Sequence, residues 1–340
     1  MARVGVGLIG CGTWGKVHAR TYAACDSVNF VATCDLDTSR AEEFARNFGA
    51  RQHYSDWREV LGNPEIQAVS IATPDFAHGE IVLAALEAGK DVLVEKPLAT
   101  TVEECETIVG ARERAGVKLM VDFHNRWNLP FVNLRSMLDT GDLGKLRMMN
   151  IRLNDTLYVP TEMLSWARRS SPAHFLGAHL VDLVRWLSGA EVKRVYSVSR
   201  SEVLKSVGIE TPDFFQSILE LSDGATAVIE NCWILNPSAP SVFDFQCEFI
   251  ASRGTAYVNA SHHRMMEVYT NKGAALPDVS GAPELYGKPL GFCVAAIEHF
   301  IDCVTTDKQP MVKAEDGLAA ARIIKAIEDS AKTRMPVDLN

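Results

Sequence analysis

The feature that most constrains the fold of this chain is a glycine motif directly after its first apolar run. Residues 3–9 form a β-rich run, Gly10-Cys11-Gly12-Thr13-Trp14-Gly15 follows, and a helical pattern covers 14–24. In such a strand–turn–helix unit the first glycine permits a tight turn, the second lets the backbone approach a pyrophosphate, and the third lets the helix pack on the strand. The anion lies at the helix N-terminus. The motif therefore predicts a Rossmann domain whose dinucleotide contacts Gly10, Gly12, Thr13, Trp14 and Gly15.

The first 123 residues repeat this alternation of strand and helix. The β-rich runs lie at 3–9, 29–34, 67–73, 91–95 and 118–123, and the helical patterns at 14–24, 38–48, 77–89 and 102–115. Such alternation predicts an α/β fold, a doubly wound parallel sheet covered by helices on both faces. We therefore expect residues 1–123 to form the dinucleotide-binding domain.

The rhythm of the chain changes after residue 123, where strand-like runs follow one another through turns. Ser222-Asp223-Gly224 and Ser252-Arg253-Gly254 are strong hairpin signals. We expect 124–340 to be an α+β substrate-binding and oligomerisation domain on a large, mostly antiparallel sheet, with a surface loop at 273–291. Strands are expected near 145–155, 192–200, 213–221, 224–234, 244–251, 254–259 and 263–270, and helices at 173–188, 291–306 and 314–332. The last helix fits equally well against the first domain.

A carboxylate at the end of the second expected strand favours NAD over NADP. Asp35 stands about 20 residues after Gly15, where a carboxylate can accept both ribose hydroxyls. A 2′-phosphate beside it would meet a repulsion of about 4 kcal/mol per charge pair at 4 Å and an effective dielectric constant near 20. Leu36 and Asp37, which follow, supply no cation, whereas Arg40 leaves NADP as the less favoured alternative. As a helix N-cap, Asp37 or Thr38 fits better than Asp35.

Composition excludes several classes of partner. The chain of 340 residues is long enough for two domains, and its net charge of −9 offers no basic surface for nucleic acid or anionic membranes. Its eight cysteines have no zinc-ligand spacing, so no metal site is predicted. The sequence contains neither a signal-peptide pattern nor an apolar run of about 18 residues. A cytoplasmic enzyme is therefore expected.

Glu95-Lys96-Pro97 ends the strand-like run 91–95, and so places a lysine at the carboxyl edge of the expected parallel sheet. Ligands of doubly wound folds bind at this edge. A lysine at a strand end is ordinarily only a solvated charge, so this tripeptide gains its meaning together with the glycine motif.

Several further motifs join these two in a resemblance to a known family. They are Ile71-Ala72-Thr73-Pro74 followed by His78, Phe123-His124-Asn125-Arg126, the helix His179-Leu180-Val181-Asp182, Glu315-Asp316-Gly317 and Met335-Pro336-Val337. Together they resemble the glucose-fructose oxidoreductase/inositol dehydrogenase/MocA (Gfo/Idh/MocA) family over most of the chain. The resemblance implies NAD as the cofactor, an open-sheet second domain, an active-site lysine at Lys96 and a peptide bond to Pro97 that is often cis.

The same resemblance implies roles for individual residues. Leu36, Thr73, Pro74, His78, Glu95 and Asn125 would join Asp35 in binding the cofactor, and His179 would contact the substrate hydroxyl. One position departs from the family pattern, because Phe175 stands where an aspartate often precedes the histidine by one turn. The proton relay is therefore expected to differ, with His174 as a candidate for part of that role.

The chemistry that these residues support is oxidation of a secondary alcohol of a sugar, cyclitol or related polyol. Lys96 would act as general base, provided that burial and the positive nicotinamide lower its pKa from the usual value near 10.4. Candidate substrate contacts are Arg126, Asp155, Tyr158, Trp166 and Arg168, with Asn154 and Arg169 nearby, although tryptophans are usually core residues and arginines usually solvated. A dinucleotide- or sugar-sensing regulator and an NAD-assisted glycoside elimination or hydrolysis remain alternatives. A homodimer or homotetramer is expected.

Overall fold

The computed structural model of the protein describes residues 3–261, 266–270 and 273–339. The chain forms two compact units. The first unit comprises Met1–Trp127 and Ser280–Ala319, and the second comprises Asn128–Val279 and Ala320–Asn340. This division differs from the single boundary at residue 123 that the sequence suggested, because a late segment of the chain returns to the first unit.

The first unit is built on a parallel sheet, as expected. Within the described residues the sheet has six strands in the order β3-β2-β1-β4-β5-β6, which is the Rossmann order. Every neighbouring pair is parallel. The strands are β1 (Val4–Ile9), β2 (Val28–Cys34), β3 (Gln52–Tyr54), β4 (Ala68–Ile71), β5 (Asp91–Val94) and β6 (Leu119–Val121).

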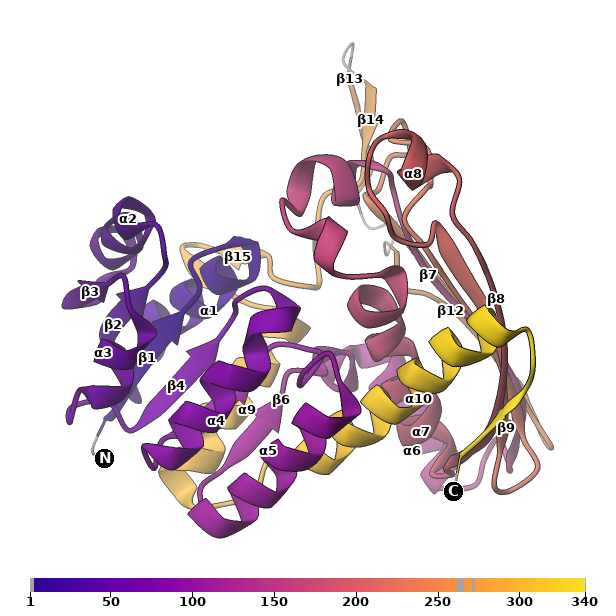
Figure 1. Ribbon diagram of the computed structural model, residues 1–340, viewed down its shortest axis with the longest axis horizontal. Helices are drawn as coiled ribbons and strands as arrows, with labels where there is room; N and C mark the ends of the chain where they lie inside the picture. The colour runs from indigo at the N-terminus through magenta and orange to yellow at the C-terminus, as the bar shows by residue number, and fades with distance from the viewer. Residues whose placement is uncertain (1–2, 262–265, 271–272, 340) are drawn as a thin grey trace. The chain divides into compact units, whose positions relative to one another are not determined.

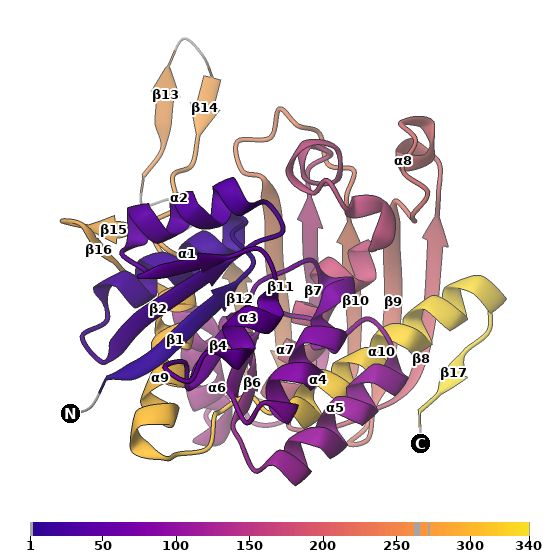
Figure 2. The same ribbon diagram turned by 60° about the vertical axis from the view of Figure 1, so that its left-hand side comes forward.

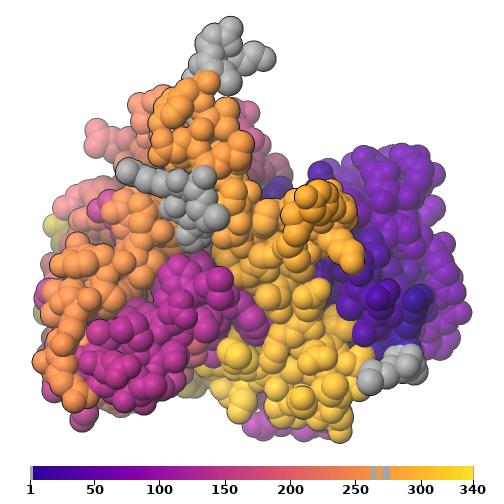
Figure 3. Space-filling model, turned by 180° about the vertical axis from the view of Figure 1, so that it is seen from behind, coloured from indigo at the N-terminus to yellow at the C-terminus, as the bar shows by residue number. Residues whose placement is uncertain are grey.

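Helices cover both faces of this sheet, which is why β4 and β6 are buried along their whole length. On one face α1 (Thr13–Ala24) packs beside α2 (Thr38–Phe48) and α9 (Phe292–Thr306). On the other, α4 (His78–Glu87) packs between α3 (Trp57–Gly62) and α5 (Val102–Ala115) (Figure 1). Figure 3 shows the orange and yellow atoms of the returning segment beside the indigo and purple atoms of the N-terminal residues.

The second unit is built on a larger, mostly antiparallel sheet. Within the described residues it has seven strands in the order β12-β11-β7-β10-β9-β8-β17, and only the pair β7–β10 is parallel. Figure 2 shows these strands side by side. The strands are β7 (Leu146–Asp155), β8 (Val192–Arg200), β9 (Phe214–Leu221), β10 (Thr226–Cys232), β11 (Phe243–Ala251), β12 (Thr255–Asn259) and β17 (Val337–Asp338). Both predicted hairpins are present, at β9–β10 and β11–β12.

The predicted helices of the second half are also present, with one difference. The segment predicted as a helix over 173–188 begins as a π-helical turn, Ala173–Gly177, and continues as α7 (Ala178–Ser188). The third, α10 (Ala314–Thr333), begins in the first unit and ends in the second. Two short helices, α6 (Leu129–Asp139) and α8 (Val203–Ser206), were not predicted.

Part of the strand predicted over 263–270 lies outside the described residues, and its end forms β13 (Val268–Thr270) with β14 (Gly273–Ala275). The predicted surface loop 273–291 also contains the short pair β15 (Glu284–Leu285) and β16 (Lys288–Pro289). Among the described residues, we find no helix with the length and apolar character needed to cross a bilayer.

Candidate active site

The glycine turn between β1 and α1 leaves one surface of the backbone open. Gly10 has φ of 101°, and a Cβ there would meet the carbonyl of Ala72, while a Cβ on Gly15 would collide with the carbonyl of Gly10. Gly12 differs, since among the described residues none other than its two chain neighbours has an atom within 4 Å of the position of its Cβ. As the N-cap of α1 it also has no side chain to bind the first helical N–H groups. An anion can therefore reach those groups at Gly12.

Asp35 lies beside this turn, at the end of β2. Its Oδ2 accepts a hydrogen bond from the backbone N–H of Cys11 at 2.9 Å, and its Oδ1 accepts one from Asp37 N–H at 3.0 Å. Arg40 pairs with Oδ1 at 3.5 Å and is half exposed. Asp37, and not Asp35, caps α2. The carboxylate is thus fixed against the glycine turn, while Leu36 beside it is 91% exposed.

The carboxyl ends of the central strands are aligned by backbone hydrogen bonds. Gly10 N–H donates to Cys34 O at 2.8 Å, and Ala72 N–H donates to Ile9 O at 2.8 Å. On the other side of the sheet, Glu95 N–H donates to Ile71 O at 2.9 Å and Asp122 N–H to Val94 O at 2.8 Å. The glycine turn, Asp35, Thr73 and Lys96 therefore follow strand ends that lie along one edge of the sheet.

Lys96 is the second residue after β5, and its peptide bond to Pro97 is cis, as the resemblance implied. The side chain is largely buried, with Lys96 6% exposed. His78, at the start of α4, has its Nδ1 2.7 Å from Pro97 O and its Nε2 2.9 Å from Thr73 O. This buried ring braces the loop after β4 against the residue that follows Lys96.

Glu95, a predicted cofactor-site residue, is buried. Its Oε1 lies 3.1 Å from Nε2 of His18 on α1, in the interior of the unit. Asp122 follows β6, and its Oδ2 lies 3.8 Å from the same ring nitrogen. The ligand-type atoms of these three buried side chains all lie within 4.8 Å of one another. We call His18, Glu95 and Asp122 the buried acid cluster.

The two carboxyls of the buried acid cluster have different proton affinities. Burial acts to raise the pKa of Glu95, but the hydrogen bond from His18 and nearby positive groups, Lys96 among them, lower it overall. Burial and the charge of Glu95 raise the pKa of Asp122. The cluster could not be predicted from the sequence, because its members come from three elements and no spacing in the chain indicates that they lie together.

The segment after β6 supplies the remaining predicted residues of the first unit. His124 stacks on Trp14 with ring centroids 5.0 Å apart, and Asn125 beside it is buried. Arg126, a predicted substrate contact, forms an ion pair with Asp316 at 3.2 Å and is itself buried.

In the second unit, predicted substrate residues lie on β7 and on the segment that leads to α7. Asp155, at the end of β7, and His179, in the first turn of α7, are buried. Trp166 meets Phe175 edge to face at 6.0 Å, and Phe175 meets the buried Trp233 at 5.8 Å. Asn154 donates to Glu230 at 2.7 Å, whereas Tyr158, Arg168 and Arg169 are exposed.

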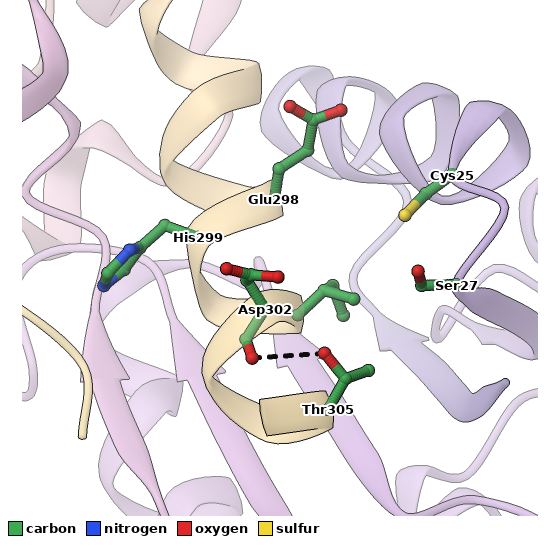
Figure 4. A pocket seen from close by; sticks show the side chains of 7 residues that line it. Cys25, Ser27, Glu298, His299, Asp302 and Thr305 are labelled. Carbon is green, nitrogen blue, oxygen red and sulfur yellow. Dashed lines mark hydrogen bonds between the residues drawn. The ribbon is translucent and has the colours of Figure 1, made fainter. Parts of the chain in front are cut away.

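A hollow of about 270 Å³ lies elsewhere on the first unit (Figure 4). Cys25 and Ser27, which line it, precede β2, and α9 supplies the other lining residues, among them Glu298, His299 and Asp302. The hollow is therefore at the amino edge of the parallel sheet. Because Asp35 and Lys96 follow the opposite ends of their strands, it is not the site that these residues form.

Comparison with known proteins agrees with both units. Residues 4–123 match the oxidoreductase family with NAD-binding Rossmann fold, and residues 131–257 match the GFO/IDH/MocA C-terminal domain. The chain belongs to the Gfo/Idh/MocA family. The family prediction from sequence motifs is thereby confirmed, as are the oxidoreductase class and the NAD-binding domain.

Individual Gfo/Idh/MocA proteins resemble the chain over most of its length. It is 27% identical over 339 residues to a scyllo-inositol 2-dehydrogenase (NAD(+)) of Bacillus subtilis, covering 98% of this chain and 95% of the relative. It is 33% identical to an inositol 2-dehydrogenase 2 of Saccharopolyspora erythraea, covering 66% of this chain and 65% of the relative. The crystal structure of a scyllo-inositol dehydrogenase of Lactobacillus casei with bound NAD(H) and scyllo-inositol matches with a TM-score of 0.84 at 18% identity, covering 99% of each chain.

Against the Gfo/Idh/MocA pattern, Phe175 is the notable departure, and the structure shows which carboxylate lies near. Glu328 of α10 has its Oε1 3.6 Å from Nδ1 of His174 and accepts a hydrogen bond from Ser171 at 3.3 Å. No sequence pattern indicated Glu328 as a partner of His174, because it lies more than 150 residues later in the chain. This histidine therefore has an acidic partner that its own segment does not provide.

Proposed function

We propose that this protein is an NAD-dependent dehydrogenase that transfers a hydride between a secondary hydroxyl of a sugar, cyclitol or related polyol and the nicotinamide. The observation that carries the proposal is the alignment of strand ends, which brings Lys96 to the same sheet edge as the glycine turn and Asp35. The inositol dehydrogenases among its relatives support a cyclitol or sugar as the substrate.

The residues of the first unit fit NAD. The open backbone at Gly12 suits a pyrophosphate, and the fixed carboxylate of Asp35 suits the two ribose hydroxyls. Leu36, Thr73, Pro74, His78 and Asn125 complete the proposed cofactor site, and Glu95 contributes through the buried acid cluster. When bound, NAD supplies the hydride acceptor.

Lys96 is the proposed general acid/base. In the oxidation it takes the proton of the substrate hydroxyl, and in the reverse reaction it returns that proton to the carbonyl oxygen. The burial of Lys96 disfavours the charged ammonium, and so does the positive charge of oxidised nicotinamide. Both effects favour the neutral amine of Lys96 during the oxidation, which is the direction that needs a base.

From the second unit we propose His179 as the contact to the reacting hydroxyl, with Asp155, Tyr158, Trp166 and Arg168 as further substrate contacts, and Arg126 from the first unit. Because Phe175 cannot orient or charge an imidazole, we propose that His174 and its partner Glu328 supply the acidic component of the relay. The proposed contact of His179 is tested with His179→Ala. We expect kcat to fall, because the reacting hydroxyl loses this contact, while NAD binding stays unchanged.

The uncovered face of the seven-stranded sheet is the proposed oligomer interface. Tyr196, Ile218 and Val228 are exposed on adjacent strands in matching register. Exposed apolar groups that adjoin in this way are typical of protein interfaces. We propose a homodimer or homotetramer through this face.

The role of Lys96 is tested with Lys96→Ala. We expect kcat to fall by at least about 10²- to 10⁴-fold, because the hydroxyl proton loses its acceptor. Binding of NAD, measured by fluorescence titration, should stay close to that of the wild type. The matched control is Lys308→Ala, an exposed lysine of the same unit, which should keep full activity.

The assay follows NADH absorbance with a panel of cyclitols, aldoses and anhydrosugars. Net NADH formation supports a dehydrogenase, and an alanine variant that keeps the wild-type rate refutes the role of Lys96. Product release without net NADH would indicate an NAD-assisted elimination or hydrolysis. Binding of cofactor without turnover of any substrate would indicate a regulator.

A further inference from the structure

The buried acid cluster adjoins the proposed base in the chain, since its member Glu95 directly precedes Lys96. Its three side chains come from α1, the end of β5 and the end of β6, and each is at most 5% exposed. Ionisable groups rarely occur in such surroundings without a role, because an isolated buried charge costs several kilocalories per mole. Three observations indicate what the cluster does.

The first observation is a chain of hydrogen bonds that ends at Glu95. The hydroxyl of Tyr22 lies 2.6 Å from Ser70 Oγ, and Ser70 Oγ lies 2.8 Å from His18 Nδ1. The Nε2 of the same ring lies 3.1 Å from Glu95. Since Nε2 faces carboxylate oxygens, which only accept, Nε2–H donates to Glu95, while Ser70 and Tyr22 extend the chain from Nδ1 of the same ring. The chain thus stabilises the ionised form of Glu95.

The second observation is that Asp122 is held less closely than Glu95, although His124 and His18 act to lower its pKa. Its Oδ2 lies 3.8 Å from His18 Nε2 and 4.0 Å from His124 Nδ1, which are distances beyond a hydrogen bond. In the part of the chain that the structure describes, Asp122 Oδ1 and Glu95 Oε2 have no hydrogen-bond partner. Two buried carboxyls that lie as close together as those of Glu95 and Asp122 do not both ionise readily. Their pKa values therefore move apart. These observations favour one shared proton in the cluster, with Asp122 as the carboxyl of higher proton affinity.

The third observation links the cluster to Lys96, because Glu95 and Lys96 are consecutive residues at the end of β5 and both are buried. The positive charge of Lys96 is among the causes that lower the pKa of Glu95. The interaction is reciprocal, so an ionised Glu95 stabilises the ammonium form of Lys96. The ionisable groups that face the cluster are His18 and Tyr22 of α1, Lys96 after β5, and His124 after β6.

We propose that the buried acid cluster is a positioning site for Lys96, which holds one negative charge and one proton near the amine and so sets the pH at which Lys96 becomes neutral. This inference rests on the proposed role of Lys96 as the base. Glu95, Asp122 and His18 act through Lys96 and do not touch the reacting atoms.

If Glu95 and Asp122 share one negative charge, the shifts in the titration midpoint of Lys96 that follow from substituting each of them should not add. In Glu95→Gln the repulsion on Asp122 disappears, so Asp122 ionises and the cluster keeps its charge. In Asp122→Asn the charge stays on Glu95. Each single variant should therefore shift the titration midpoint of Lys96 by less than about half a pH unit. The double variant loses the charge, and its midpoint should fall by on the order of one pH unit.

The direct measurement is a ¹³C NMR titration of the full-length protein labelled at lysine Cε, with the Lys96 signal assigned by its absence from Lys96→Ala. The acidic limb of the kcat profile should move to lower pH in parallel, because oxidation needs the neutral amine. Glu103→Gln, an exposed carboxylate of α5, is the matched control and should shift neither. The NMR midpoint does not depend on turnover, so it tests the cluster even if no polyol is oxidised and the proposed function fails.

A double variant with the wild-type midpoint would overturn the proposal, and so would two single shifts that add up to the double shift. A stoichiometric metal ion in the purified protein would do the same, since the cluster would then bind a cation in place of the proton. If the double variant does not fold, His18→Asn serves instead. Loss of the hydrogen bond to Glu95 should also lower the midpoint of Lys96, and an unchanged midpoint contradicts the inference.

Discussion

The proposed determinant of the choice of nicotinamide cofactor is Asp35, at the end of β2. Its two oxygens accept hydrogen bonds from Cys11 and Asp37 N–H groups, and the same carboxylate holds Arg40 at 3.5 Å. Arg40 is thus a cation that could bind a 2′-phosphate, but it is paired with Asp35, whose carboxylate repels a phosphate. We therefore propose that the preference for NAD depends on the side chain of Asp35.

Asp35→Ser should therefore both weaken the use of NAD and free Arg40. We expect kcat/KM for NAD to fall by about 10- to 100-fold, the worth of hydrogen bonds to a charged group. The ratio of kcat/KM values for NADP and NAD should rise by more than the loss with NAD alone, because repulsion disappears as well. The measurement is the initial rate with each cofactor at a fixed polyol concentration.

Asp37→Ser is the matched control, since it removes the other carboxylate near Arg40 while serine can still cap α2. It should have nearly wild-type stability and leave the cofactor ratio unchanged. Equal ratios in the two variants would mean that Asp35 is not the determinant.

Residues that the sequence could reveal are those whose environment is local. The glycine turn, Asp35 and Lys96 each follow an apolar run directly, so that the strand pattern alone gives their position at the sheet edge. The contacts of Glu95 and Arg126 were not accessible in this way. Glu95 meets a ring 77 residues earlier in the chain, and Arg126 pairs with Asp316 far after it. Such contacts depend on how the elements pack.

At the scale of elements, the apolar patterns of the sequence predicted buried strands but did not indicate an exposed one. β1, β4 and β5 are apolar runs and were predicted within two residues of their ends. β3 has three largely exposed residues, so it carries no apolar pattern. The π-helical turn Ala173–Gly177 has the same apolar periodicity as a short α-helical stretch, and only the backbone distinguishes them.

The packing of α1 on the turn that precedes it yields a prediction about Gly15. Since a Cβ at this position would collide with the carbonyl of Gly10, Gly15→Ala must displace the start of α1. We expect it to destabilise the protein by about 1–3 kcal/mol, the usual cost of overpacking, and to weaken NAD binding. Chemical denaturation and NAD titration measure the two effects.

Gly62→Ala is the matched control. Gly62 lies at the end of α3, and apart from its chain neighbours and the backbone of α3 no described atom is within 4 Å of the position of its Cβ. It should have nearly wild-type stability and NAD affinity. If Gly15→Ala behaves like Gly62→Ala, the close contact between α1 and the turn does not exist in solution.

At the scale of the whole molecule, the second unit presents a sheet face whose composition is unusual for a solvated surface. On β9 and β10, Ile218 pairs directly with Val228, and on β8 Tyr196 pairs with Ile218. Polar groups flank this row, among them Gln216 and Glu230, which are joined by a hydrogen bond of 2.8 Å. An apolar centre with a polar rim is the usual anatomy of a protein interface.

If this face joins two copies of the chain, a charge at its centre should separate them. The double variant Ile218→Glu/Val228→Glu would bury four carboxylates in a symmetric dimer, and a buried unpaired charge is strongly unfavourable. Sedimentation should therefore give a dimer or tetramer for the wild type and a monomer for the variant. Val203→Glu, an exposed valine on α8 outside the sheet, controls for added charge and should keep the wild-type mass. A wild-type chain that sediments as a monomer would show that the apolar row has another purpose, because no second copy then covers it.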